Sequence, residues 1–140
     1  PINEDYRLTN GIRFNVPLDD LRNYVHVYEN FLFLLNNDRT NDTASIRRYV
    51  SEGDQYLEKK ELPMIWGRSI VFNNWIFYFT GEKDLISVDM NDLSFEIIKT
   101  NLEYSSMILG IDENGIVNVQ TESRGPTLRI LSAKLPDQYI

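Results

Sequence analysis

The chain of 140 residues has 42% hydrophobic residues, and its 14 Lys and Arg against 21 Asp and Glu give a net charge of −7. Its length suits a single domain, and its average composition excludes a disordered tail, a collagen-like chain and a low-complexity linker. The acidic balance disfavours nucleic-acid binding, and the absence of Cys and the single histidine, His26, exclude disulfides, a thiol nucleophile, cysteine zinc sites and sites that need two histidines.

The first element expected is a hairpin over residues 6–16, because Thr9-Asn10-Gly11 separates two strand-like segments. Residues 17–22 follow as the best candidate for a short helical turn, so helix is minor. The N-terminus lacks the basic start and apolar run of a signal peptide. No apolar stretch approaches the ~20 residues of a membrane-spanning helix. We therefore expect no membrane partner, and an intracellular or virion-associated location with the cytoplasm as the default.

Three later segments, at residues 25–35, 69–79 and 109–119, share one pattern. Each has a short apolar run, a polar pair ending in Asn, and a second apolar run. The runs are rich in residue types that suit strands, and Asn tolerates the positive φ of a tight hairpin turn. The pattern predicts three β-hairpins with turns at Asn30, Asn74 and Asn114.

The similarity extends past the hairpins into repeat units of roughly 24–62, 68–100 and 107–134. The turn asparagines are 44 and 40 residues apart, at positions 30, 74 and 114. A four-stranded unit that repeats every ~40–50 residues is typical of a β-propeller blade. We predict one all-β domain, 1–140, of three four-stranded antiparallel blade units forming a partial propeller. The third unit is one strand short, and the N-terminal strand is expected to complete it or to pair with another chain.

The apolar patterns of the strands predict which faces are covered. Residues 31–35 and 75–79 are apolar at every position, which indicates strands covered on both faces. In the third unit, Ile116, Asn118 and Gln120 alternate with Val117 and Val119. One face of that unit is therefore expected to meet water, a channel or a partner.

The second unit resembles blades of kelch-type and F-box-associated propeller domains. The resemblance lies in Ser-Ile-Val-Phe-Asn-Asn-Trp-Ile-Phe-Tyr-Phe at residues 69–79, followed by Leu-Ile-Ser-Val-Asp-Met and Phe-Glu-Ile-Ile; residues 110–119 are similar to later blades of those families. It covers roughly residues 24–132 as a pattern, without a kelch double glycine or a WD dipeptide. The resemblance implies a protein-binding platform with loops at one end of the blades, and it carries over no catalytic residue.

Three blades are fewer than the ~4–8 that close a propeller. A lone arc of three would expose hydrophobic blade faces and strand edges. We therefore expect association, either of two copies into a ring of six units or with a larger assembly.

The residues that could carry chemistry form no catalytic pattern. The adjacent carboxylates Asp112 and Glu113 would point to opposite faces of a strand, which does not suit the facing pair of a glycosidase. Residues 36–42 are predicted to form a loop and offer oxygen ligands without the spacing of a helix-loop-helix calcium site. His26 is interpreted as a strand residue that faces solvent or as a satisfied interior polar group. We expect no enzyme activity, no cofactor and no metal.

Candidate partner-binding residues are of two kinds. Aromatic side chains near strand ends or loops are often binding hot spots, and those chosen here are Trp66, Tyr56 and Tyr104. Packing within or between blades is the other interpretation of these aromatics. Asn118 and Gln120 belong to the polar face of the third unit.

The leading hypothesis is a non-enzymatic protein-interaction or structural module, assembled with itself or with a larger partner. Two alternatives remain open. The charge of −7 would suit a small acidic inhibitor or immunity-type protein that covers a basic site, since complementary charge steers association. A carbohydrate-binding β domain is the second alternative, by analogy with other propellers and aromatic-rich β domains.

Overall fold

The structure is a computed structural model that describes residues 23–50, 56–81, 84–100, 107–121 and 129–140, with backbone alone at 23, 56, 57 and 121. Within these ranges it is all-β, as predicted. The expected hairpin at 6–16 and the turn at 17–22 lie outside the described residues, as does Tyr104. The described helices include none that is long and apolar enough to cross a membrane.

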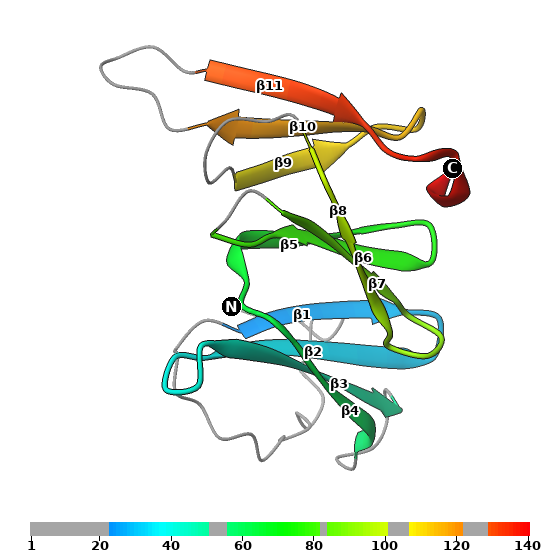
Figure 1. Ribbon diagram of the computed structural model, residues 1–140. Helices are drawn as coiled ribbons and strands as arrows, with labels where there is room; N and C mark the ends of the chain where they lie inside the picture. The colour runs from blue at the N-terminus through cyan, green and yellow to red at the C-terminus, as the bar shows by residue number, and fades with distance from the viewer. Residues whose placement is uncertain (1–22, 51–55, 82–83, 101–106, 122–128) are drawn as a thin grey trace, which may run out of the picture.

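The described residues include eleven strands, which form three antiparallel sheets that stack as layers (Figure 1). The first sheet has the order β1 (Asn23–Tyr28), β2 (Phe31–Asp38), β3 (Thr43–Val50), β4 (Tyr56–Pro63). The second has the order β5 (Trp66–Phe72), β6 (Trp75–Phe79), β7 (Leu85–Asp89), β8 (Phe95–Ile98). The third comprises β9 (Met107–Ile111), β10 (Ile116–Thr121) and β11 (Arg129–Lys134), and a 3-10 turn, η2 (Asp137–Tyr139), follows it.

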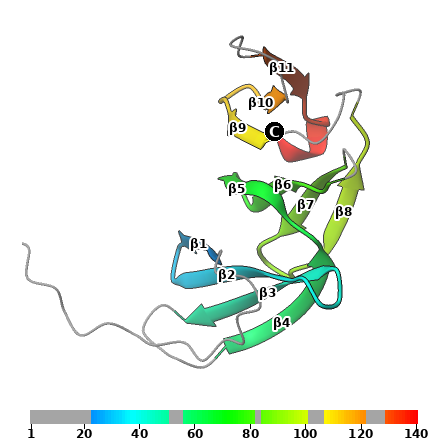
Figure 2. The ribbon, with the colours of Figure 1, turned by 90° about the vertical axis from the view of Figure 1, so that its left-hand side faces the viewer.

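One part of the blade prediction needs correction, because the third sheet has three strands within the described ranges, not four. The physical reason is that β11 is followed by η2, which turns back towards the second sheet instead of adding a strand. The stack is an open arc and does not close into a propeller (Figure 2).

The three hairpins are present with their turns at the predicted places, between β1 and β2, β5 and β6, and β9 and β10. The strained residue differs from the prediction in two of them. The positive φ lies on Glu29 (54°) and Asn73 (53°), one residue before the predicted asparagines. In the third turn Gly115 has φ 78°, and a Cβ there would lie 2.9 Å from the side chain of Ile140. Glycine therefore meets both a conformational and a steric demand at that position.

Two hydrophobic clusters lie between the layers, one on each side of the second sheet, and the second sheet contributes residues to both. On β6, Ile76 and Tyr78 face the first sheet, whereas Phe77 and Phe79 face the third. All four are buried. This confirms that the strand with no polar position is covered on both faces. The alternation on β10 is also confirmed, because Val117 and Val119 are buried while Ile116, Asn118 and Gln120 are half-buried.

The first strands of the sheets lie next to one another, because β5 contacts both β1 and β9. His26 Nε2 on β1 lies 2.6 Å from Ser69 Oγ on β5. The hydroxyl of Tyr28 donates to Asn74 Oδ1 across the same two sheets. These bonds agree with the interpretation of His26 as a satisfied structural residue.

Buried polar contacts hold the connection between the first two sheets. Asn37, 4% exposed, donates to the carbonyl of Ile65 (2.9 Å) and accepts from its N–H (2.8 Å). Arg48 crosses from β3 to the backbone carbonyl of Met90 (3.1 Å), while Arg47 lies on the opposite face. The basic doublet thus splits between faces, as expected for a strand.

Candidate functional site

Among the described residues, no strand covers the outer edge of the third sheet along β11. Within the described ranges β11 pairs only with β10. The N–H of Leu135 donates to the carbonyl of Gly115, and the N–H of Asp112 donates to the carbonyl of Ile116. Backbone groups of an antiparallel strand alternate between its two sides. The backbone of Leu131 and Ala133 therefore faces β10, and that of Ile130, Ser132 and Lys134 faces outward.

The last strands of the first two sheets, β4 and β8, carry more features that discourage pairing than β11, whose charged residues Arg129 and Lys134 lie only at its two ends. The segment 58–61 of β4 reads Glu-Lys-Lys-Glu, and the strand ends at Pro63. β8 has only four residues. Charged side chains, proline and short length protect edge strands. β11 has six residues, no proline and an Ile130 that is 52% exposed. It is the outer strand best suited to take a further strand.

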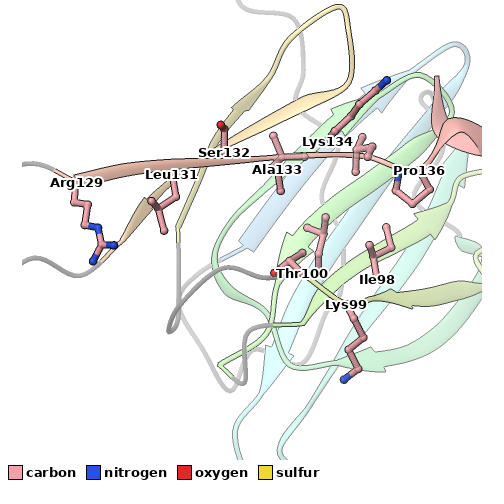
Figure 3. A pocket seen from close by; sticks show the side chains of 12 residues that line it. Ile98, Lys99, Thr100, Arg129, Leu131, Ser132, Ala133, Lys134 and Pro136 are labelled. Atoms are coloured by element: carbon pink, nitrogen blue, oxygen red, sulfur yellow. The ribbon is translucent and has the colours of Figure 1, made fainter.

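A groove of about 540 Å³, here called the β11 groove, runs between β11 and the end of β8. Figure 3 shows Leu131 and Ala133 pointing from β11 toward the side of Ile98, while Ser132 and Lys134 point to the opposite face. Apolar side chains form much of the lining: Leu85, Ile98, Val117, Leu131, Ala133 and Leu135. Arg129 and Lys99 lie at its rim, and Lys99 pairs with Asp84 at 2.7 Å.

The outer face of the third sheet carries two of the predicted partner-binding residues. Asn118 lies between Gly110 and Ser132 in the register, and Gln120 lies between Met107 and Ile130. Both side chains are half-buried. Met107 and Ile130 are 36% and 52% exposed. This face is therefore a mixed polar and apolar surface that adjoins the β11 edge.

The structure does not gather the five predicted residues into one site. Trp66 begins β5 and is 54% exposed. The next residue, Gly67, lies against Met107, because a Cβ built there would lie 3.2 Å from its Cγ. Tyr56 lies on β4, with only its backbone described, and Tyr104 lies outside the described ranges. Tyr24 and Tyr28, which also lie near strand ends, pack against the first core cluster.

The sequence interpretation missed the β11 groove. Its apolar lining comes from β7, β8, β10 and β11, so no local pattern brings these residues together. One signal was available: a third unit one strand short must leave an open edge beside its last strand. That signal predicts an open edge at β11, but it does not predict the β11 groove.

Two further groups of polar side chains are held by bonds within the chain. Glu96 Oε2 accepts from Gln138 and from the hydroxyl of Tyr139 (3.1 Å each), beside a hollow of about 180 Å³. Asp38 accepts from the backbone of Thr40 and Asn41. Asn36 and Asn37, assigned to a loop from the sequence, belong to β2 and are buried. The described part of the chain holds no group of three or more His, Cys, Asp or Glu placed to bind a metal.

Comparison with known proteins adds no assignment. No protein-family model matches the chain, and no curated protein matches it significantly.

Proposed function

We propose that this chain is a non-enzymatic protein-interaction module that takes up an extended segment of a partner along β11. The observation that carries the proposal is the outward-facing backbone of Ile130, Ser132 and Lys134 above an apolar groove. Addition of a strand to an exposed sheet edge gives affinity through main-chain hydrogen bonds, while pockets for alternate side chains give specificity. The groove supplies such a pocket on the inner side of the edge.

The repeated sheets support the same proposal at a coarser level. In the first two sheets a fourth strand covers the third, as β4 covers β3 and β8 covers β7. An added strand beside β11 would give the third sheet four strands, as in the other two sheets. The resemblance to propeller domains, which implies a protein-binding platform, is consistent with this function.

The test is a peptide selection on the immobilised chain, followed by affinity measurement with the selected synthetic peptides. We expect the selection to yield extended peptides with alternating apolar residues. Ser132→Pro should bind these peptides more than about tenfold more weakly than the unsubstituted chain does. The proline removes an outward N–H without removing a bond to β10. Ser132→Ala, the matched control, keeps that N–H and should bind within about twofold. Peptides that bind folded Ser132→Pro with unchanged affinity would contradict the proposal.

The two alternative functions predict different results. An acidic inhibitor would bind a basic protein with an affinity that falls steeply with salt, and Ser132→Pro would leave that binding unchanged. A carbohydrate-binding domain would give hits on a glycan array, with Trp66 as an exposed aromatic available for stacking.

A further inference from the structure

A segment that binds beside β11 must meet defined requirements. Its occupant must be extended, must bring N–H and C=O groups to Ile130, Ser132 and Lys134, and must turn apolar side chains toward Leu131, Ala133 and Ile98. A strand with apolar residues at every second position meets these demands, because alternate side chains share one face.

The chain itself contains such a segment ahead of β1. Residues 12–16 read Ile-Arg-Phe-Asn-Val, with three apolar residues separated by two polar ones. In a strand, Ile12, Phe14 and Val16 would share the groove side, and Arg13 and Asn15 would share the solvent side. The segment is five residues long, close to the length of β11.

The connection between this segment and β1 favours an edge on another copy. From Val16 to Asn23 there are seven residue steps, which span at most about 25 Å. Two sheet spacings of roughly 10 Å and about three strand spacings of 4.8 Å separate β1 from the place beyond β11, which is also about 25 Å in a straight line. The segment could therefore meet the β11 edge of its own molecule only with this connection extended to its full length.

We propose that residues 12–16 of a second copy add to the edge of β11 as the fourth strand of the third sheet. This inference rests on the proposed function and names its partner. Each copy then gives one strand and receives one, so the contact is heterologous, and it produces either a closed ring or a growing chain. Two copies would bring together six sheets, a number within the ~4–8 that close propellers.

The first experiment is light scattering of the full chain across concentrations. We expect a mass near twice 16.4 kDa, or a higher multiple, as the concentration rises. Ser132→Pro and Phe14→Ser should each raise the concentration needed for association by about tenfold or more. Their controls, Ser132→Ala and Asn15→Ser, should leave it within about threefold, because neither removes a backbone donor nor a groove-facing side chain.

The second experiment uses the absence of native cysteine. Chains carrying Asn15→Cys and Ser132→Cys, with different tags, are mixed under mild oxidation. We expect a disulfide between the two tagged chains, since directly opposed residues on one sheet face have Cβ atoms roughly 5 Å apart. A chain with Lys60→Cys on β4, which is exposed, replaces Ser132→Cys as the control and should not cross-link to Asn15→Cys.

The outcomes separate this inference from the proposed function. A chain that stays at 16.4 kDa at all concentrations, or that associates equally well with Phe14→Ser, overturns the inference. If such a chain still binds selected peptides in a manner sensitive to Ser132→Pro, the proposed function stands and only the identity of the partner is wrong.

Discussion

His26 links the first strands of two sheets, and its environment determines how stability depends on pH. Burial lowers the pKa of His26 from its ordinary 6.5, because the charged imidazolium loses hydration. The unfolded chain then takes up the proton before the folded chain does as pH falls. The free energy of unfolding should therefore decrease as pH is lowered through 6.5 toward the lowered folded pKa.

Denaturant unfolding at a series of pH values between 5 and 7.5 tests this prediction. The unsubstituted chain should lose stability toward the acidic end, while His26→Gln should show a flatter profile over the same range. Parallel profiles for the two proteins would show that His26 does not govern the dependence.

At the scale of elements, Asn37 stabilises the connection between β4 and β5 through two hydrogen bonds to the backbone of Ile65. Asn37→Ala leaves a buried N–H and a buried carbonyl without these partners, which should destabilise the chain by about 3 kcal/mol. Asn41→Ala, at an exposed turn position, is the control and should cost within about 0.5 kcal/mol. Equal unfolding midpoints for the two variants in urea would disprove the assigned role.

The turn η2 packs the C-terminal end of the chain against the second sheet. Tyr139 is 1% exposed, its ring lies 5.0 Å from Trp75 and 5.3 Å from Phe77, and its hydroxyl lies 2.7 Å from Ser87 Oγ. Burial also raises the pKa of Tyr139, so the hydroxyl stays protonated at neutral pH and can donate a hydrogen bond.

Truncation of this side chain should therefore be costly. We expect Tyr139→Ala to reduce the free energy of unfolding by about 3–5 kcal/mol. Tyr139→Phe keeps the ring contacts and loses only the hydroxyl bonds, so it should cost about 1 kcal/mol. Thermal and urea unfolding of both variants measure the difference. A Tyr139→Ala protein as stable as Tyr139→Phe would show that the ring packing contributes little.

Sequence reasoning worked where a local pattern determines the outcome. The three turns, the strand types and the burial of both faces of β6 follow from residues within a few positions of one another. The interpretation that Asn30 and Asn74 take the positive φ was wrong in detail, because the hairpin geometry places it on Glu29 and Asn73. Residues 36 and 37 were assigned to a loop because amides are common in loops, but buried partners allow β2 to continue through them.

At the scale of the whole molecule, the second sheet is the common layer and the two outer sheets differ. It packs against both neighbours with largely apolar strand faces. The β11 groove and the packing of η2 on the second sheet could not be predicted, since each depends on contacts between residues distant in sequence. Of the candidate site residues, Asn118, Gln120 and Trp66 lie on exposed or half-buried surface, but the groove that best suits a partner is formed by other residues.

The central claim is that the outer edge of β11 is open in the single chain and is covered on binding. Residue-resolved amide hydrogen exchange tests it directly, because protection reports local hydrogen bonding. In dilute protein, the N–H groups of Leu131 and Ala133 should exchange about tenfold or more slowly than those of Ile130 and Ser132. At high concentration, or with a selected peptide, Ile130 and Ser132 should become protected as well. Protection of all four in dilute protein, or fast exchange of Ile130 and Ser132 under every condition, would contradict the account.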